Sequence, residues 1–162
     1  MFADAVRHLF DYHFAENRTA WDAVALLSNE DFAREAAYSH GSVRNQVVHL
    51  VDVDQAWFSD LGAVSLPDGP DAEALDRDGI RARWDEIERQ QRAWLAGLTD
   101  EALGRKPIAE GEDKDLLLWQ ILLHVANHGT DHRAQLLRLL NDLGVKTTSQ
   151  DYIFYVYDHP QV

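Results

Sequence analysis

The sequence predicts an all-α protein, an up-down four-helix bundle with a short extra helix or tail, formed as a single domain over residues 1–162. Three observations predict this fold. Four long segments carry apolar residues at the spacing of amphipathic helices. No segment shows the sustained apolar–polar alternation that is typical of strands. The chain has 162 residues, 46% of them hydrophobic, and no Cys, so one packed core must hold it together without disulfides.

The first helix is expected over residues 3–27. Val6, Phe10, Val24 and Leu27 fall on one face of it. His13 and Asn17 lie near the middle of the same face, so both are predicted to point inward. Because buried polar groups are almost always hydrogen-bonded, these two side chains should have partners.

The second long helix is predicted to begin after Ser42, a good N-cap residue, and to reach about Leu61. A short helix around residues 31–36 precedes it. Residues 62–71 contain two Pro and two Gly and are expected to form a loop. The third helix then spans about residues 76–98.

The last part of the chain holds one long helix between two less regular segments. Residues 99–114 contain Pro107 and Gly111 and are expected to form a small hairpin or an open loop. The fourth helix is predicted over about 115–143, with Gly144 as its stop signal. The aromatic tail, residues 152–157, fits either a short helix or an extended segment.

The charge balance and the apolar runs restrict the partners of this protein. Fifteen basic residues against 28 acidic ones give a formal net charge of −13, which disfavours contact with nucleic acid. No apolar run approaches the roughly 20 residues that a membrane span requires, and the N-terminus lacks the pattern of a signal peptide. We therefore expect a soluble, cytoplasmic protein that binds neither nucleic acid nor membranes.

Three histidines follow one another at i, i+4 spacing in the fourth helix: His124, His128 and His132. Residues at this spacing are neighbours on one helix face. His128 and His132 fall at the centre of the apolar stripe, and His124 falls at its flank. One inward histidine is usually just hydrogen-bonded, but two at this spacing favour a shared divalent cation, which satisfies both rings. His124 is then a third ligand, a neighbour of the ligands or a packing residue.

A further ligand must come from another helix. The candidates are His13, His49 and Asp52, and the periodicity of the helices does not choose among them. Asp52 and Asp131 are the carboxylates nearest to these histidines in the sequence, where they would serve either as hydrogen-bond acceptors for ligating imidazoles or as solvated surface acids.

Two segments resemble the signatures of the DinB/YfiT-like family: residues 42–50, which end in His49-Leu50, and residues 128–135, which read His-Gly-Thr-Asp-His-Arg-Ala-Gln. The resemblance extends over nearly the whole chain, although His13 stands where many members have Asn. It implies a four-helix bundle, commonly a homodimer, with a divalent metal: zinc or nickel, with iron or manganese as alternatives. Carried over by position, the family's metal ligands are His49, His128 and His132.

Three protein nitrogens leave at least one position on the metal open to water or substrate. Metal-bound water and metal-bound thiols both ionise readily. The resemblance therefore implies a metal-dependent thiol transferase or hydrolase linked to stress or detoxification, with a small-molecule thiol or electrophile as partner and His13 or Asp52 handling protons. The alternative is a non-catalytic, metal-binding stress-response dimer. The dimer face is expected to contain some of four aromatic residues: Trp57, Phe58, Trp84 and Trp94.

Overall fold

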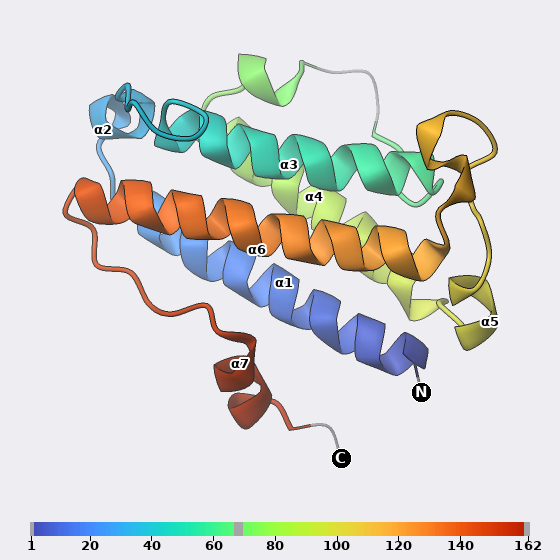
Figure 1. The fold of residues 1–162 in the computed structure, drawn as a ribbon. Helices are drawn as coiled ribbons and strands as arrows, with labels where there is room; N and C mark the ends of the chain where they lie inside the picture. The colour runs from blue at the N-terminus through green and yellow to red at the C-terminus, as the bar shows by residue number, and fades with distance from the viewer. Residues whose placement is uncertain (1, 67–69, 161–162) are drawn as a thin grey trace.

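The computed structural model describes residues 2–66 and 70–160, and four long helices form its bundle (Figure 1). These are α1 (Phe2–Val24), α3 (Val43–Asp60), α4 (Arg77–Ala96) and α6 (Leu118–Asp142). Five shorter helices lie between and after them: α2 (Asn29–Ala33), η1 (Ala72–Ala74), α5 (Asp100–Leu103), η2 (Glu112–Asp115) and α7 (Tyr152–Asp158). The predicted all-α bundle is confirmed.

Local signals in the sequence fix the ends of the long helices. The Ser42 hydroxyl accepts a hydrogen bond from the Asn45 N–H at 3.0 Å, and this cap starts α3 as predicted. Asp76 caps α4 in the same way, by accepting from the Gly79 N–H at 2.8 Å. After α6, Gly144 has φ of 82°, a left-handed conformation that ends the helix and that glycine adopts without strain.

The directions of the helices depart from strict up-down alternation. Helices α3 and α4 run parallel, as contacts at both ends show. At their starts, Arg44 of α3 donates to the Leu75 carbonyl just before α4. At their ends, Phe58 of α3 packs on Trp94 of α4. The chain must therefore cross back between them (Figure 1). Part of this predicted loop, residues 67–69, lies outside the described residues. Helix α6 runs antiparallel to α3 and alongside α1.

The core lies between the four long helices and is rich in aromatic side chains. Phe10, Phe14 and Phe58 are fully buried, and each contributes about 1.5–3 kcal/mol by leaving water. The expected dimer face is not available as an exposed surface. Phe58 and Trp84 are buried, while Trp57 and Trp94 are partly buried against the same core. Phe58 instead packs edge-on against Trp94 where α3 meets α4.

The two less regular segments are each partly helical. Residues 99–114 form neither strand nor hairpin within the part of the chain that is described. Helix α5 and the start of η2 lie at their two ends, and residues 104–111 between them form an open loop, the second of the two predicted alternatives. The aromatic tail forms α7, which packs on α1 through T-shaped contacts between Tyr12 and both Tyr152 and Tyr155. Among residues 2–66 and 70–160, no helix combines the length and the apolar character that crossing a membrane requires.

Candidate metal centre

Three histidines meet where α3 and α6 lie side by side. His49 stands in the middle of α3, and His128 and His132 face it from α6 because four residues bring them to one side of that helix. The Nε2 atoms of His49 and His128 are 3.2 Å apart. The ring centroid of His132 lies 4.4 Å from that of His49 and 4.2 Å from that of His128. The structure thus brings together all three residues that the family resemblance assigned to a metal.

A fourth histidine, His40, joins this group from the loop before α3. One nitrogen each of His40, His49 and His132 lie within 4.8 Å of one another. The His40 ring stacks on the His49 ring with centroids 4.0 Å apart and an angle of 22°. Sequence reasoning missed His40 because a loop has no periodicity from which a direction could be predicted. The only available hint was its place two residues before the Ser42 cap. We refer to His40, His49, His128 and His132 as the histidine cluster.

Three rings of the cluster, those of His49, His128 and His132, are held in the neutral form. Burial, and then repulsion from the neighbouring rings of His40, His132 and His128, together lower the pKa of His49 to about 4, because adjacent imidazolium ions repel. Burial and His132 likewise lower the pKa of His128 to about 4. The pKa of His132 is also lowered by burial. At neutral pH these rings are uncharged and keep a free lone pair, as a metal ligand must.

A buried amide orients one member of the cluster. Gln46, one turn before His49 on α3, is fully buried and donates to His132 Nδ1 at 2.9 Å and to the His132 carbonyl at 3.0 Å. Metal-binding histidines generally have their second nitrogen fixed by such a neighbour. Gln46 therefore restricts rotation of the His132 ring and supports its position beside His49.

The predicted proton-handling residues lie in different surroundings. His13 is fully buried beneath the cluster, and its Nε2 lies 3.2 Å from Asp54 Oδ2. Arg133 donates to His13 Nδ1 at 3.1 Å, so the ring proton is on Nε2 and points to Asp54. Asp52 is exposed on α3, one turn from His49. A role for either residue in proton transfer stays a prediction.

The other two candidates from the sequence are at the margin of the cluster. His124 is exposed, and its ring packs edge-on against Trp57 with centroids 5.2 Å apart. Its ring centroid is 5.9 Å from that of His128. Asp131 is exposed, accepts from Gln135 at 3.1 Å, and opposes the lowering of the His128 and His132 pKa values. Of the three successive histidines in α6, His128 and His132 are those whose rings meet the His49 ring, whereas His124 meets Trp57 further along α3.

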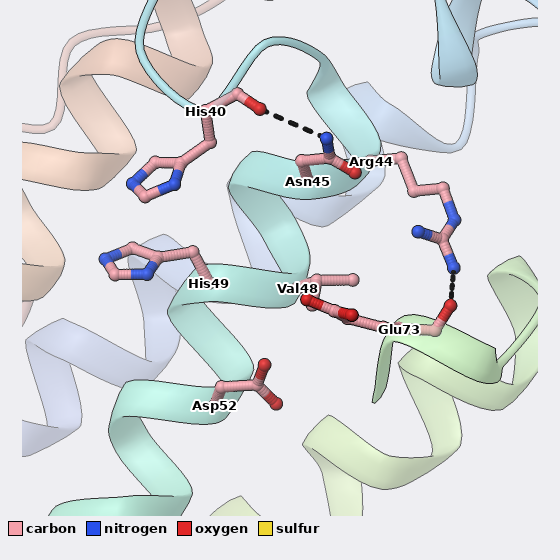
Figure 2. Close-up of a pocket in the computed structure, with 7 residues that line it drawn as sticks. All are labelled: His40, Arg44, Asn45, Val48, His49, Asp52 and Glu73. Atoms are coloured by element: carbon pink, nitrogen blue, oxygen red, sulfur yellow. Dashed lines mark hydrogen bonds between the residues drawn. The ribbon is translucent and has the colours of Figure 1, made fainter. Parts of the chain in front are cut away.

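A pocket of about 410 Å³ opens beside the cluster, and Figure 2 shows the seven residues that line it: His40, Arg44, Asn45, Val48, His49, Asp52 and Glu73. His40 and His49 belong to both the pocket and the cluster, so a molecule in the pocket can reach a metal held there. Burial raises the pKa of Asp52, although Arg83 opposes this shift. The pocket therefore combines guanidinium, carboxylate and imidazole groups.

Comparison with known proteins gives two results. The model of the DinB family matches residues 1–161 of the chain. The chain is also similar to Protein DinB of Bacillus subtilis (strain 168), with 23% identity over 165 residues that cover 96% of this chain and 95% of the relative. Both matches extend over nearly the whole length, as the resemblance in the sequence implied.

Proposed function

Because this chain belongs to the DinB family, we propose that His49, His128 and His132 bind one divalent metal ion and that the protein is a metal-dependent enzyme. The observation that carries the proposal is the 3.2 Å between His49 Nε2 and His128 Nε2. Two nitrogens bound to tetrahedral zinc at about 2.0–2.1 Å are about 3.3 Å apart. The two rings are therefore already at the spacing that a shared ion requires.

The chemistry that we propose is transfer of a small thiol to an electrophile, with hydrolysis as the related alternative. A divalent ion on three histidines would lower the pKa of a thiol or water molecule bound at its open position. The sulfur would then form a bond to an electrophilic carbon while the S–H bond breaks and a leaving group departs. Asp52 is placed in the pocket to accept the released proton, and its raised pKa suits a proton acceptor.

The chain offers separate groups for binding a substrate beside the metal. Arg44 lines the pocket, and its guanidinium donates to the Leu75 carbonyl at 3.1 Å and to the Glu73 carbonyl (Figure 2). These contacts fix the cation at the wall, where it would hold an anionic part of the substrate. Asp52 and Glu73 lie close by and would hold a cationic part. His13 would act from beneath the cluster, through Asp54, on the position of His128.

The alternative proposal is a metal-binding stress-response homodimer without catalytic activity. In that case the metal would stabilise the fold, by RT ln(1 + [metal]/Kd). The pocket at the cluster favours the enzyme, because a purely structural ion has no need of an adjacent cavity of about 410 Å³. We propose zinc or nickel as the metal, with iron or manganese as alternatives, and a cytoplasmic role in stress or detoxification.

Elemental analysis of the purified protein tests the metal centre directly. We expect about one equivalent of metal per chain in the native protein and none in a His128→Ala/His132→Ala double variant. A His124→Ala variant is the matched control, since it removes a histidine from the same helix outside the cluster, and it should keep its metal. A native protein that takes up no zinc, nickel, iron or manganese on supplementation would disprove the proposed centre.

Activity separates the two proposals once metal binding is established. The metal-loaded protein would be screened for consumption of thiols such as cysteine and glutathione in the presence of an alkylating electrophile, and for hydrolysis of activated esters. For the enzyme, we expect turnover that Asp52→Asn reduces by about 10²–10⁴-fold, the usual contribution of a general base. Full metal occupancy without turnover, together with a metal-dependent rise in melting temperature, would favour the stress-response protein instead.

A further inference from the structure

We propose that His40 is a fourth nitrogen ligand of the metal, which occupies the open position in the resting protein and is displaced by the incoming substrate thiol. The proposal rests on the proposed metal centre and adds a ligand to it. It assigns a function to a loop residue outside the three histidines that the resemblance implied.

The position of His40 satisfies the first requirement of a ligand, which is distance. Its ring nitrogen lies in one group with nitrogens of His49 and His132, all within 4.8 Å of one another. The spacing in a tetrahedral site is about 3.3 Å, so closing around an ion would bring these nitrogens up to about 1.5 Å nearer to one another. It would also turn the His40 ring out of its stack on His49, because two parallel rings cannot both direct a lone pair at one ion. Figure 2 shows the His40 and His49 rings lying one above the other and pointing the same way.

The backbone around His40 is held by contacts that also hold the rest of the cluster. Ser39 donates to Gln46 Oε1 at 2.5 Å, and the same Gln46 amide donates to His132. The His40 carbonyl accepts from the Asn45 side chain at 3.1 Å (Figure 2). Ser39 has φ of 52°, a left-handed conformation that costs about 1 kcal/mol or more in a residue with a side chain. This loop is thus fixed in the one shape that turns residue 40 towards α3.

The side chain of His40, in contrast with its backbone, makes no hydrogen bond to the other described residues. His40 is exposed, and its ring packs on the rings of His49 and His132 rather than in the core. Rotating it away from the metal would bring it into the pocket or solvent and leave the core contacts intact. His49, His128 and His132 lie on the two packed helices and cannot withdraw as easily. His40 is therefore the ligand that a substrate would displace.

Displacement of His40 by a substrate thiol would explain why His40 belongs to both the pocket and the cluster. With four histidines on a tetrahedral ion, no position is left for water, so the resting metal would not hydrolyse bystander molecules. A thiol that binds in the pocket would pass its proton to Asp52 and take the place of the His40 nitrogen. His49, His128 and His132 would keep their places while the His40 ring turns aside.

Cobalt(II) substitution tests this ligand, because the visible spectrum of the ion reports the number and kind of its ligands. We would compare the native protein with His40→Ala, His40→Phe and His124→Ala. Phe keeps a ring that can stack on His49 but has no nitrogen to offer. We expect both His40 variants to weaken cobalt binding at least about tenfold and to change the spectrum in the same way, whereas His124→Ala matches the native protein.

Titration with 2-mercaptoethanol tests displacement. A sulfur-to-cobalt charge-transfer band should appear at lower thiol concentration in both His40 variants than in the native protein, because no imidazole has to leave. X-ray absorption of the cobalt protein should count four imidazoles before the titration and three after it in the native protein, and three throughout in the variants.

The outcomes distinguish this inference from the proposal on which it rests. Native affinity and spectrum in both His40 variants would overturn the fourth ligand while leaving the three-histidine centre intact. Native behaviour in His40→Phe alone would also overturn it, since the ring would then act by stacking. A native protein that binds no cobalt would overturn both proposals. Circular dichroism of each variant checks the fold, which a change at an exposed loop residue should preserve.

Discussion

Two groups of polar side chains lie next to each other in this bundle, and they differ in how many of their polar atoms are hydrogen-bonded. The first, which we call the buried network, consists of His13, Asn17, Asp54 and Arg133, each at most 3% exposed. The second is the histidine cluster, which is half-buried or exposed. In the buried network each ring nitrogen of His13 has a partner, and Arg133 donates to Asn17 Oδ1 at 2.8 Å and to Gln150 Oε1 at 3.1 Å.

The histidine cluster has the opposite character. Its closest contact joins two Nε2 atoms, those of His49 and His128, where one ring can donate to the lone pair of the other. Burial and mutual repulsion keep the rings of His49 and His128 neutral. Among the described residues, the ring nitrogens of the cluster are hydrogen-bonded only by one another and by Gln46. The difference teaches that an inward histidine serves structure when both of its nitrogens are bonded and is available to a ligand when they are not.

The largest effect that we expect comes from breaking the buried network. Arg133→Met should lower the free energy of unfolding by about 3–5 kcal/mol, because it leaves His13 Nδ1 and Asn17 Oδ1 without their donor and removes the buried positive charge that interacts with the Asp54 carboxylate. In metal-free protein, His49→Ala should change the free energy of unfolding by less than about 1 kcal/mol, since the His49 side chain is partly exposed. Urea unfolding monitored by circular dichroism measures both. Equal destabilisation by the two substitutions would remove the distinction between the two groups.

A smaller effect is expected where α6 approaches His13. A Cβ added at Gly129 would lie 2.3 Å from His13 Cε1 and 2.7 Å from its Nδ1, and the His13 ring is fixed by the buried network. Gly129→Ala should therefore cost about 1–3 kcal/mol by overpacking. Gly97→Ala is the control, because its added Cβ meets nothing closer than the Trp94 carbonyl at 3.6 Å. Thermal denaturation of both variants measures this difference. Equal melting temperatures for Gly129→Ala and Gly97→Ala would contradict the expected overpacking.

A third effect that we expect is a dependence of the stability of the metal-free protein on pH. The pKa of His49 and of His128 falls from 6.5 to about 4 on folding, so between these values the unfolded chain binds more protons. Stability contributed by the two rings is present above pH 6.5 and is lost as the pH falls towards 4. The urea midpoint should therefore decrease over this range.

A variant isolates the contribution of the cluster from that of other acidic and basic groups. In His49→Ala/His128→Ala, the urea midpoint of metal-free protein should decrease less steeply between pH 6.5 and 4 than in the native protein. If the two curves run parallel, the rings are not held neutral by the fold.

Much of this site could be predicted from the sequence, though for different reasons at different residues. The i, i+4 spacing placed His128 and His132 together, because helix geometry alone decides it. The inward direction of His13 and Asn17 followed from the same periodicity and is confirmed by their burial. The burial of Arg133 was not predicted, because this residue lies about 120° around the helix from the centre of the apolar stripe, on a side that α1 covers.

The sequence by itself determined the helices, the Ser42 and Gly144 signals that bound them, and the histidine pair on α6, since each depends on residues within a few positions of one another. Only the tertiary structure decided the parallel course of α3 and α4, the placing of His49 beside His128, the burial of Arg133 against His13, and the arrival of His40 from a loop. These depend on which helices pack together and on the shape of a connection, and both are set by the packing of the whole core.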